Sequence, residues 1–301
     1  MAHHHHHVKG KNLFITIILN IIITLSQIVG GIYANSLSLL SDAMHNLSDV
    51  LSLVIAWAAN TIAAKPSTKS YTFGLKRAEI IAALFNASLL LGIAIFLVIE
   101  AFHKFFHPQS VDSLWVIWLG GLSILLNTLS VLLVKKDSEK NINIKAAYLH
   151  LLTDVFTSIA VVVGGLLMQF YHIYWVDPAV SLLIAFYLIY ASIDIVKESI
   201  AILMEFAPKS IDIEKIADEV KKIEKVENIH HIHIWRLGEH DIFLEAHIDF
   251  KENLPLQEVT QIIADIEKLL REKFYISHVT LQPEFQRDDD KSIVVQRDPG
   301  A

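Results

Sequence analysis

The sequence contains no cysteine among its 301 residues. Disulfide bonds and thiolate metal sites are therefore excluded, because both need a cysteine sulfur. Histidine and carboxylate side chains remain as the strong metal ligands, and the chain has 16 histidines and 32 Asp and Glu residues. The HExxH pattern, in which two histidines hold zinc beside a glutamate base, is also absent. This second absence argues against an intramembrane metalloenzyme.

Charged residues are scarce, at 19% of the chain, whereas hydrophobic residues make up 53%. This balance is too apolar for one ordinary soluble domain and indicates a membrane protein. A helix needs ~20 apolar residues to cross a hydrocarbon core of ~30 Å. Nearly uncharged runs, extended by their polar ends, predict six transmembrane helices in a lipid bilayer: 13–34, 50–64, 85–99, 113–134, 156–176 and 178–193.

After Ala207 the composition changes, because charged residues become frequent and no further apolar run is long enough to span a membrane. Much of the net charge of -7 comes from this region. The chain therefore divides into four predicted parts: an N-terminal tail (1–11), a transmembrane domain (12–207), a C-terminal domain (208–286) and a disordered acidic end (287–301).

The N-terminal tail holds a run of five histidines, His3 to His7. It is either an affinity-tag remnant or a natural metal-collecting tail, and no site is assigned to it. The first apolar run is too long for the core of a cleavable signal and lacks a small-residue cleavage motif. We expect it to remain as the first membrane helix.

Orientation follows from the Lys and Arg residues in the connections between the predicted helices. With the N-terminus inside, the outer connections hold only Lys104. This bias predicts that both termini lie in the cytoplasm. We also expect a multi-pass protein of the cell (inner) membrane that binds no nucleic acid. The inner segments hold Lys9, Lys11, Lys65, Lys69, Lys76, Arg77, Lys135, Lys136, Lys140 and Lys145.

Two stretches carry a histidine and an aspartate four residues apart, His45 with Asp49 and His150 with Asp154. On a helix this spacing places both side chains on one face. At 1.5 Å per residue, each pair lies about 14 to 20 Å into its helix, and the two helices enter from opposite sides. The pairs are thus expected to meet near the midplane, where two imidazoles and two carboxylates suit a tetrahedral zinc ion.

Asp42 shares the helical face of His45 and Asp49. It is open whether Asp42 lines an outer approach to the metal or is a carboxylate favoured by the N-terminal end of its helix.

The C-terminal domain is predicted as a small α+β fold in the order helix, strand, strand, helix, strand, with both helices on one face of the sheet. Alternation along the second strand separates a core face from a polar face that includes His247. The same alternation in the first strand places His231 and His233 on one face and His230 on the apolar face. The predicted elements are 211–224, 229–237, 241–250, 256–274 and 278–282.

Three segments carry a resemblance to the zinc-transporting, bacterial-type branch of the cation diffusion facilitator family: SLLSDAMHNLSD, YTFGLKRAEI and AAYLHLLTDV. The resemblance covers the chain from about Asn12 to Phe285. It implies a homodimeric antiporter of divalent metal and protons, with six transmembrane helices and a cytoplasmic domain like a metallochaperone. Histidine is absent from the loop at 135–145, which points to a bacterial-type exporter.

The resemblance also implies roles for particular residues. Those of the transport site are His45, Asp49, His150 and Asp154, and a charge interlock falls on Arg77 and Glu205. In the C-terminal domain, the family's ligand positions fall on His247, Glu284 and His230. The alternation of the first strand separates His230 from His247 unless that strand is irregular. The loop at 67–75 has no Asp or His, so the additional metal site of some relatives is expected to be absent.

The sequence as a whole predicts a secondary transporter that exports zinc from the cytoplasm in exchange for protons, and not an enzyme. Zn²⁺ is the expected substrate and a possible regulator, while Cd²⁺, Co²⁺, Mn²⁺ and Fe²⁺ stay open. The alternative is a membrane-embedded metal sensor or metalloenzyme without transport.

Overall fold

The computed structural model describes residues 10–138, 142–238 and 241–294, with side chains described from 18 to 135, from 148 to 238 and from 241 to 294. The histidine run at 3–7 lies outside this part of the chain. Residues separate into two units, the first made of 1–58 and 82–196 and the second of 59–81 and 197–301.

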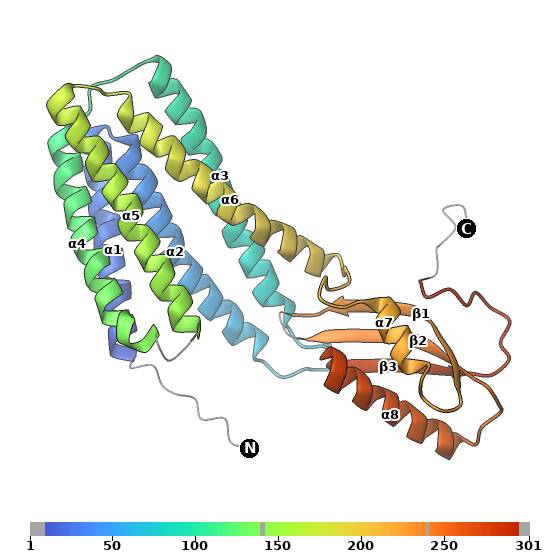
Figure 1. Cartoon of the computed structure of the whole chain (residues 1–301). Helices are drawn as coiled ribbons and strands as arrows, with labels where there is room; N and C mark the ends of the chain where they lie inside the picture. The colour runs from blue at the N-terminus through green and yellow to red at the C-terminus, as the bar shows by residue number, and fades with distance from the viewer. Residues whose placement is uncertain (1–9, 139–141, 239–240, 295–301) are drawn as a thin grey trace. The chain divides into compact units, whose positions relative to one another are not determined.

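Long helices make up the N-terminal two thirds of the chain, where they run side by side in a bundle (Figure 1). Each exceeds the ~20 residues that a membrane crossing requires. Their bounds are α1 (Gly10–Ala34), α2 (Leu37–Ala63), α3 (Arg77–Phe106), α4 (Ser113–Ser138), α5 (Ile142–Tyr171) and α6 (Val176–Leu203).

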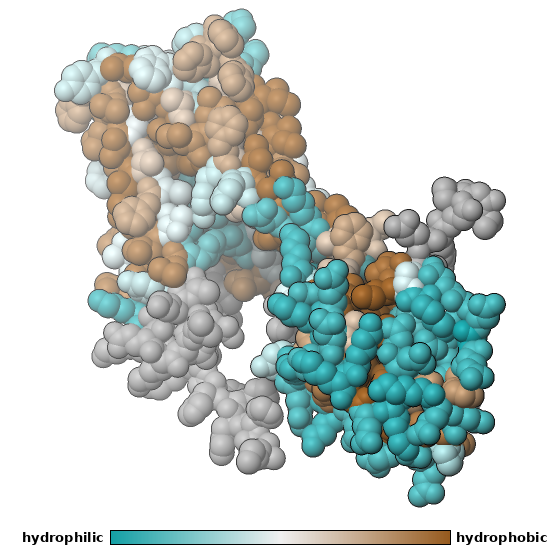
Figure 2. Space-filling view, turned by 45° about the vertical axis from the view of Figure 1, so that its right-hand side comes forward, coloured by the Kyte–Doolittle hydropathy of each residue, from teal (hydrophilic) through white to brown (hydrophobic). Residues whose placement is uncertain are grey.

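Helices α2 to α6 are long and apolar enough to cross a membrane, and α1 adds an apolar stretch over Ile18–Ala34 within its 25 residues. Large apolar side chains point outward from the bundle, such as Trp118, Phe170 and Tyr190, each more than 70% exposed. Figure 2 shows apolar residues covering much of the helical part and hydrophilic residues covering the C-terminal domain. The predicted six-helix membrane fold is confirmed.

The start of α2 is fixed by a carboxylate from another helix. Asp177, at the beginning of α6, accepts hydrogen bonds from the backbone N–H groups of Leu37 and Ser38 at 2.7 and 3.2 Å. It also accepts from the hydroxyls of Ser36 and Ser38, both at 2.6 Å. Because the first N–H groups of a helix lack partners within it and carry partial positive charge, this buried carboxylate satisfies them. The contact sets the start of the helix that carries His45.

Glycine permits close approach between helices at two points. A Cβ atom at Gly30 of α1 would lie 1.8 Å from a side-chain carbon of Leu119 in α4. A Cβ atom at Gly120 would lie 2.6 Å from a carbon of Val162 in α5. Small residues let membrane helices pack closely, so these glycines hold α4 against both α1 and α5.

The C-terminal domain is a three-stranded sheet with two helices, arranged in chain order as α7, β1, β2, α8 and β3. Strand order is β1-β2-β3, with β1 and β2 antiparallel and β2 and β3 parallel. Apolar residues of both helices and all three strands form one core, which places the helices on one face as predicted. The bounds are α7 (Ile213–Val220), β1 (Val226–Arg236), β2 (Ile242–Phe250), α8 (Leu256–Phe274) and β3 (His278–Glu284).

Strand β1 is irregular at its histidines, and this corrects the predicted position of His230. The register pairs His230 with His247 and His233 with Glu245, so β1 has one residue more than β2 between these pairs. His231 takes a positive φ of 52° at this point. A β-bulge of this kind turns the strand, so that His230 shares the face of His247 instead of lying on the apolar face.

The end of the chain also differs from its predicted disorder, because residues 287–294 fold back onto the domain. The backbone N–H groups of His231 and Ile232 donate to the carbonyls of Ser292 and Ile293 at 3.1 and 2.8 Å. Ile293 packs against the apolar core of the domain. The rest of the predicted disordered end, 295–301, lies outside the described residues.

Candidate metal centres

Helices α2 and α5 bring the four residues predicted for the transport site together. His45 Nε2 lies 3.2 Å from Asp154 Oδ1, and His150 Nε2 lies 3.1 Å from Asp49 Oδ2. Each histidine thus faces the carboxylate of the other helix. The i,i+4 spacing on each helix supplies one histidine and one aspartate on the same face, as the sequence predicts.

The four side chains fit a tetrahedral divalent cation. One ligand atom from each lies within 4.8 Å of the other three. Four ligands placed about 2.0 Å from a zinc ion at the corners of a tetrahedron are about 3.3 Å apart. The two closest pairs already have this separation, and His45 Nε2 lies 3.9 Å from Asp49 Oδ2. A small contraction therefore converts this arrangement into a complete coordination shell.

The site is enclosed on one side and open on the other. His45 and Asp154 are buried, whereas the side chain of His150 is 43% exposed. Two buried atoms, Nδ1 of His45 and Oδ2 of Asp154, have no hydrogen-bond partner within the described part of the chain. Unpaired buried polar atoms are costly, so a cation that engages the carboxylate would relieve part of this cost.

Asp42 is separate from the quartet and makes a different set of contacts. It is fully buried and accepts hydrogen bonds from Gln27 of α1 at 2.5 Å and from Thr157 and Ser158 of α5 at 3.0 and 3.1 Å. Gln27 accepts in turn from Asn46, at 3.0 Å. Asp42 is expected from the sequence either to line an outer approach to the metal or to be a carboxylate favoured by the N-terminal end of its helix. Neither description fits these contacts, since Asp42 joins three helices through hydrogen bonds beside the site.

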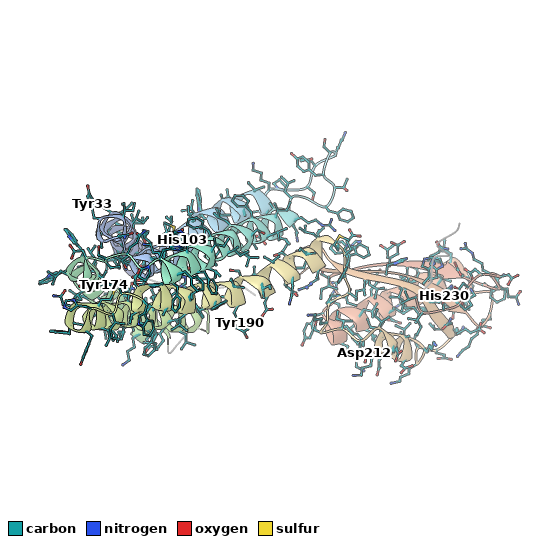
Figure 3. All side chains as sticks on the ribbon, turned by 90° about the horizontal axis from the view of Figure 1, so that it is seen from above. Tyr33, His103, Tyr174, Tyr190, Asp212 and His230 are labelled. Atoms are coloured by element: carbon teal, nitrogen blue, oxygen red, sulfur yellow. The ribbon has the colours of Figure 1, made fainter. Side chains whose placement is uncertain are left out.

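The second cluster lies on the sheet of the C-terminal domain, where Figure 3 labels His230. His247 Nδ1 lies 3.0 Å from Glu284 Oε1, and His230 Nε2 lies 3.5 Å from Glu284 Oε2. Asp289 completes the group, its Oδ2 3.7 Å from His230 Nε2. One ligand atom from each of the four lies within 4.8 Å of the others, so this group also fits a tetrahedral cation.

Ionisation in this cluster favours metal binding. Burial lowers the pKa of His247, so its imidazole is neutral near pH 7. Burial opposes the charged form of Glu284, but hydrogen bonds from Gln282 and Lys291 outweigh it and hold the pKa of that carboxyl below its usual value. A metal ion needs a neutral imidazole and an ionised carboxylate, and this is the state that the domain provides.

Sequence reasoning missed Asp289 because the residue falls in the segment expected to be disordered. A signal was present, since Asp288, Asp289 and Asp290 precede Lys291 and follow the family's last ligand position by a few residues. Acidic runs near a chain end are common in solvated tails, so this pattern alone does not predict a ligand.

The two residues predicted as a charge interlock are in contact. Arg77 Nη2 lies 2.6 Å from Glu205 Oε1, and the neighbouring Lys76 Nζ lies 2.6 Å from Asp241 Oδ2. The side chains of Arg77 and Glu205 are 35% and 57% exposed. Exposed ion pairs contribute about 0 to 1 kcal/mol, so this pair defines geometry more than it adds stability.

Six membrane helices that carry a His/Asp cluster suited to a cation, followed by an α+β domain with a second such cluster, are features of membrane proteins that handle divalent cations. The chain belongs to the cation efflux family. The model of the cation efflux transmembrane domain matches residues 13–204, and that of the cation efflux protein cytoplasmic domain matches residues 208–286. The resemblance read from the sequence motifs is thereby confirmed.

Similar proteins extend over nearly the whole chain. A cadmium, cobalt and zinc/H(+)-K(+) antiporter of Bacillus velezensis is 34% identical over 98% of this chain and 96% of its own length. The metal cation efflux system protein CzcD of Cupriavidus metallidurans is 32% identical over 93% of this chain and 89% of its own length. The zinc transporter ZitB of Pectobacterium atrosepticum is 31% identical over 96% of this chain and 91% of its own length.

Proposed function

We propose that this protein is a secondary transporter that exports zinc from the cytoplasm in exchange for protons. The observation that carries the proposal is the convergence of His45, Asp49, His150 and Asp154, on two membrane helices, within 4.8 Å of one another. Ionisable side chains inside membrane spans are costly and usually mark an ion pathway. Relatives named as zinc transporters and as a metal antiporter support the same reading.

The chemistry of the quartet couples the metal to protons. A histidine that binds metal must be neutral and an aspartate must be ionised, so protons and metal compete for the same four groups. Protons that arrive from outside displace the metal there, and their loss to the cytoplasm restores the ligands. Alternating access would move the helices that carry the site relative to the rest of the membrane domain.

The donor set favours zinc and admits related ions. Two imidazoles and two carboxylates suit Zn²⁺, Co²⁺ and Cd²⁺, which are the metals in the name of the Bacillus relative. Harder ions such as Mn²⁺ prefer a site richer in oxygen ligands. We therefore propose zinc as the main substrate, with cadmium and cobalt next.

We further propose that the protein acts as a homodimer in the inner membrane, with both termini in the cytoplasm and its C-terminal domain as a regulatory metal sensor. The excess of Lys and Arg in the inner connections supports this orientation. Free zinc is scarce in the cytoplasm, so the cluster at His230, His247, Glu284 and Asp289 would report its rise. Arg77 and Glu205 would link the domain to the ends of α3 and α6.

The alternative function is a membrane sensor that binds metal without moving it. Zinc uptake into proteoliposomes with an imposed pH gradient separates the two. An antiporter moves zinc in the direction opposite to the proton flow. Collapse of the pH gradient then abolishes the gradient-driven movement of zinc. Zinc binding without flux under either condition would favour the sensor.

A further inference from the structure

Residues 287–294, here called the strap, lie beyond the matched family domain, which ends at residue 286. The strap is nevertheless built into the fold. Backbone hydrogen bonds join Ser292 and Ile293 to the bulge of β1, and the side chain of Ile293 reaches the core. The strap loses conformational entropy when it adopts this path, and these contacts offset that loss.

The strap delivers one possible ligand to the metal cluster. Asp289 Oδ2 lies 3.7 Å from Nε2 of His230. His230 is 0% exposed, and its ring nitrogens face only carboxylates among the residues that the structure describes, Asp249 on the Nδ1 side and Glu284 and Asp289 on the Nε2 side. A buried imidazole with carboxylate oxygens converging on its Nε2 is an arrangement of donors that suits a divalent cation. Without the strap, the cluster would have three ligands, namely His230, His247 and Glu284.

The strap also delivers a cation to the same place. Lys291 Nζ lies 2.9 Å from Asp249 Oδ1 and 3.3 Å from Glu284 Oε2, and it contacts Asp289 as well. Asp249 in turn faces Nδ1 of His230 at 3.2 Å. The ammonium group therefore neutralises carboxylates that surround the metal cluster, including two of its four proposed ligands.

An ammonium group and a divalent cation compete for these carboxylates. Two cations within a few ångströms of each other repel strongly in a partly buried site. Metal bound by Glu284 and Asp289 would therefore weaken the ion pairs between these carboxylates and Lys291. Asp289 would remain as a ligand while the lysine side chain moves to solvent.

We propose that the strap sets the zinc affinity of the C-terminal site, with Asp289 as its fourth ligand and Lys291 as a tethered competitor that occupies the carboxylates in the absence of metal. The inference rests on the proposed metal site of this domain. The inference goes beyond that site, because the strap lies outside the matched family domain.

The test uses full-length protein in detergent, with Asp49→Ala and Asp154→Ala in the background so that the membrane quartet does not bind zinc. Zinc affinity is measured by competition with a coloured chelator. Lys291→Met is expected to tighten binding by about tenfold or more, because the competing charge is removed. Asp289→Asn is expected to weaken binding by about tenfold or more, because a ligand is lost.

Two matched controls lie elsewhere in the same domain. Lys273→Met removes a lysine that pairs with Glu219 at 2.7 Å, and Asp265→Asn changes an exposed carboxylate of α8. Both are expected to leave zinc affinity unchanged. In parallel, hydrogen exchange at the amides of His231 and Ile232 follows the strap itself. Zinc should slow this exchange in the background protein but not in Asp289→Asn.

The outcomes separate this inference from the proposal it rests on. Equal zinc affinity in the background protein and in both strap variants would overturn the role of the strap and leave the metal site standing. No zinc binding by the background protein would overturn both, while the transport function would be untouched because it rests on the quartet. A shift in opposite directions for Lys291→Met and Asp289→Asn supports the inference.

Discussion

His230 lies directly opposite His247 across the β1–β2 pair, with ring centroids 5.3 Å apart. The pairing depends on the single additional residue in β1 near His231, which takes a φ of 52°. Regular alternation would place His230 in the apolar core, because a shift of one residue moves a side chain to the other face of a sheet. The bulge therefore brings His230 and His247 together in the candidate metal cluster of the C-terminal domain.

The strained position at His231 gives a first prediction. His231→Gly should maintain or raise stability, since glycine adopts positive φ without a steric penalty. His231→Val should destabilise the protein by about 1 to 3 kcal/mol, because a β-branched residue is disfavoured there. Thermal unfolding of the two variants, compared with the parent, measures the difference. Equal melting temperatures for glycine and valine would contradict a bulge at this position.

Asp42 gives a second prediction. Asp42→Ala would leave Gln27, Thr157 and Ser158 without their buried acceptor, at about 1 to 3 kcal/mol for each unsatisfied group. We expect lower thermal stability in detergent and slower transport, with the order of metal preference unchanged because Asp42 is not a ligand. Ser192→Ala, which removes a buried hydroxyl that donates to the Leu188 carbonyl within α6, is the control. A changed metal preference in Asp42→Ala would place Asp42 in the coordination shell instead.

Metal preference tests His45 itself. Carboxylate ligands favour harder ions than imidazole does, so His45→Asp should reduce the preference for zinc and admit manganese more readily. Competition between metals in transport assays measures this change, and His103→Asp at the exposed end of α3 is the control. An unchanged metal profile would count against His45 as a ligand.

The C-terminal site should show a characteristic pH dependence. The pKa of His247 is lowered by burial, so this imidazole is already neutral at pH values above its usual pKa of about 6.5. The zinc affinity of the protein with Asp49→Ala and Asp154→Ala in the background should therefore be nearly constant above pH 7 and fall as protonation begins at lower pH.

A double variant tests the regulatory role of the same site. Replacing both His247 and Glu284 by alanine should weaken binding and raise the zinc concentration needed for half-maximal transport, with a comparable maximal rate. Unaltered binding by the double variant would place the regulatory site elsewhere.

Sequence reasoning succeeded where the geometry is local. Helical spacing alone joins His45 to Asp49 and His150 to Asp154, and the apolar periodicity of α8 gave its bounds, Leu256–Phe274. It failed where contacts come from distant parts of the chain. The bulge at His231 and the return of Asp289 depend on partners in β2 and in the strap, and no pattern within a short window encodes them. The hydrogen bonds to Asp42 are of the same kind, since they come from α1 and α5.

The central claim is that the quartet carries zinc across the membrane in exchange for protons. Its most direct test is zinc flux through purified protein in proteoliposomes with an imposed pH gradient, for the parent and for His45→Ala, Asp49→Ala, His150→Ala and Asp154→Ala. The account predicts flux driven by the gradient in the parent and none in any of the four variants, each remaining folded, because each ligand supplies a quarter of the coordination shell. Near-normal flux in any folded variant, or parent flux that ignores the gradient, would contradict it.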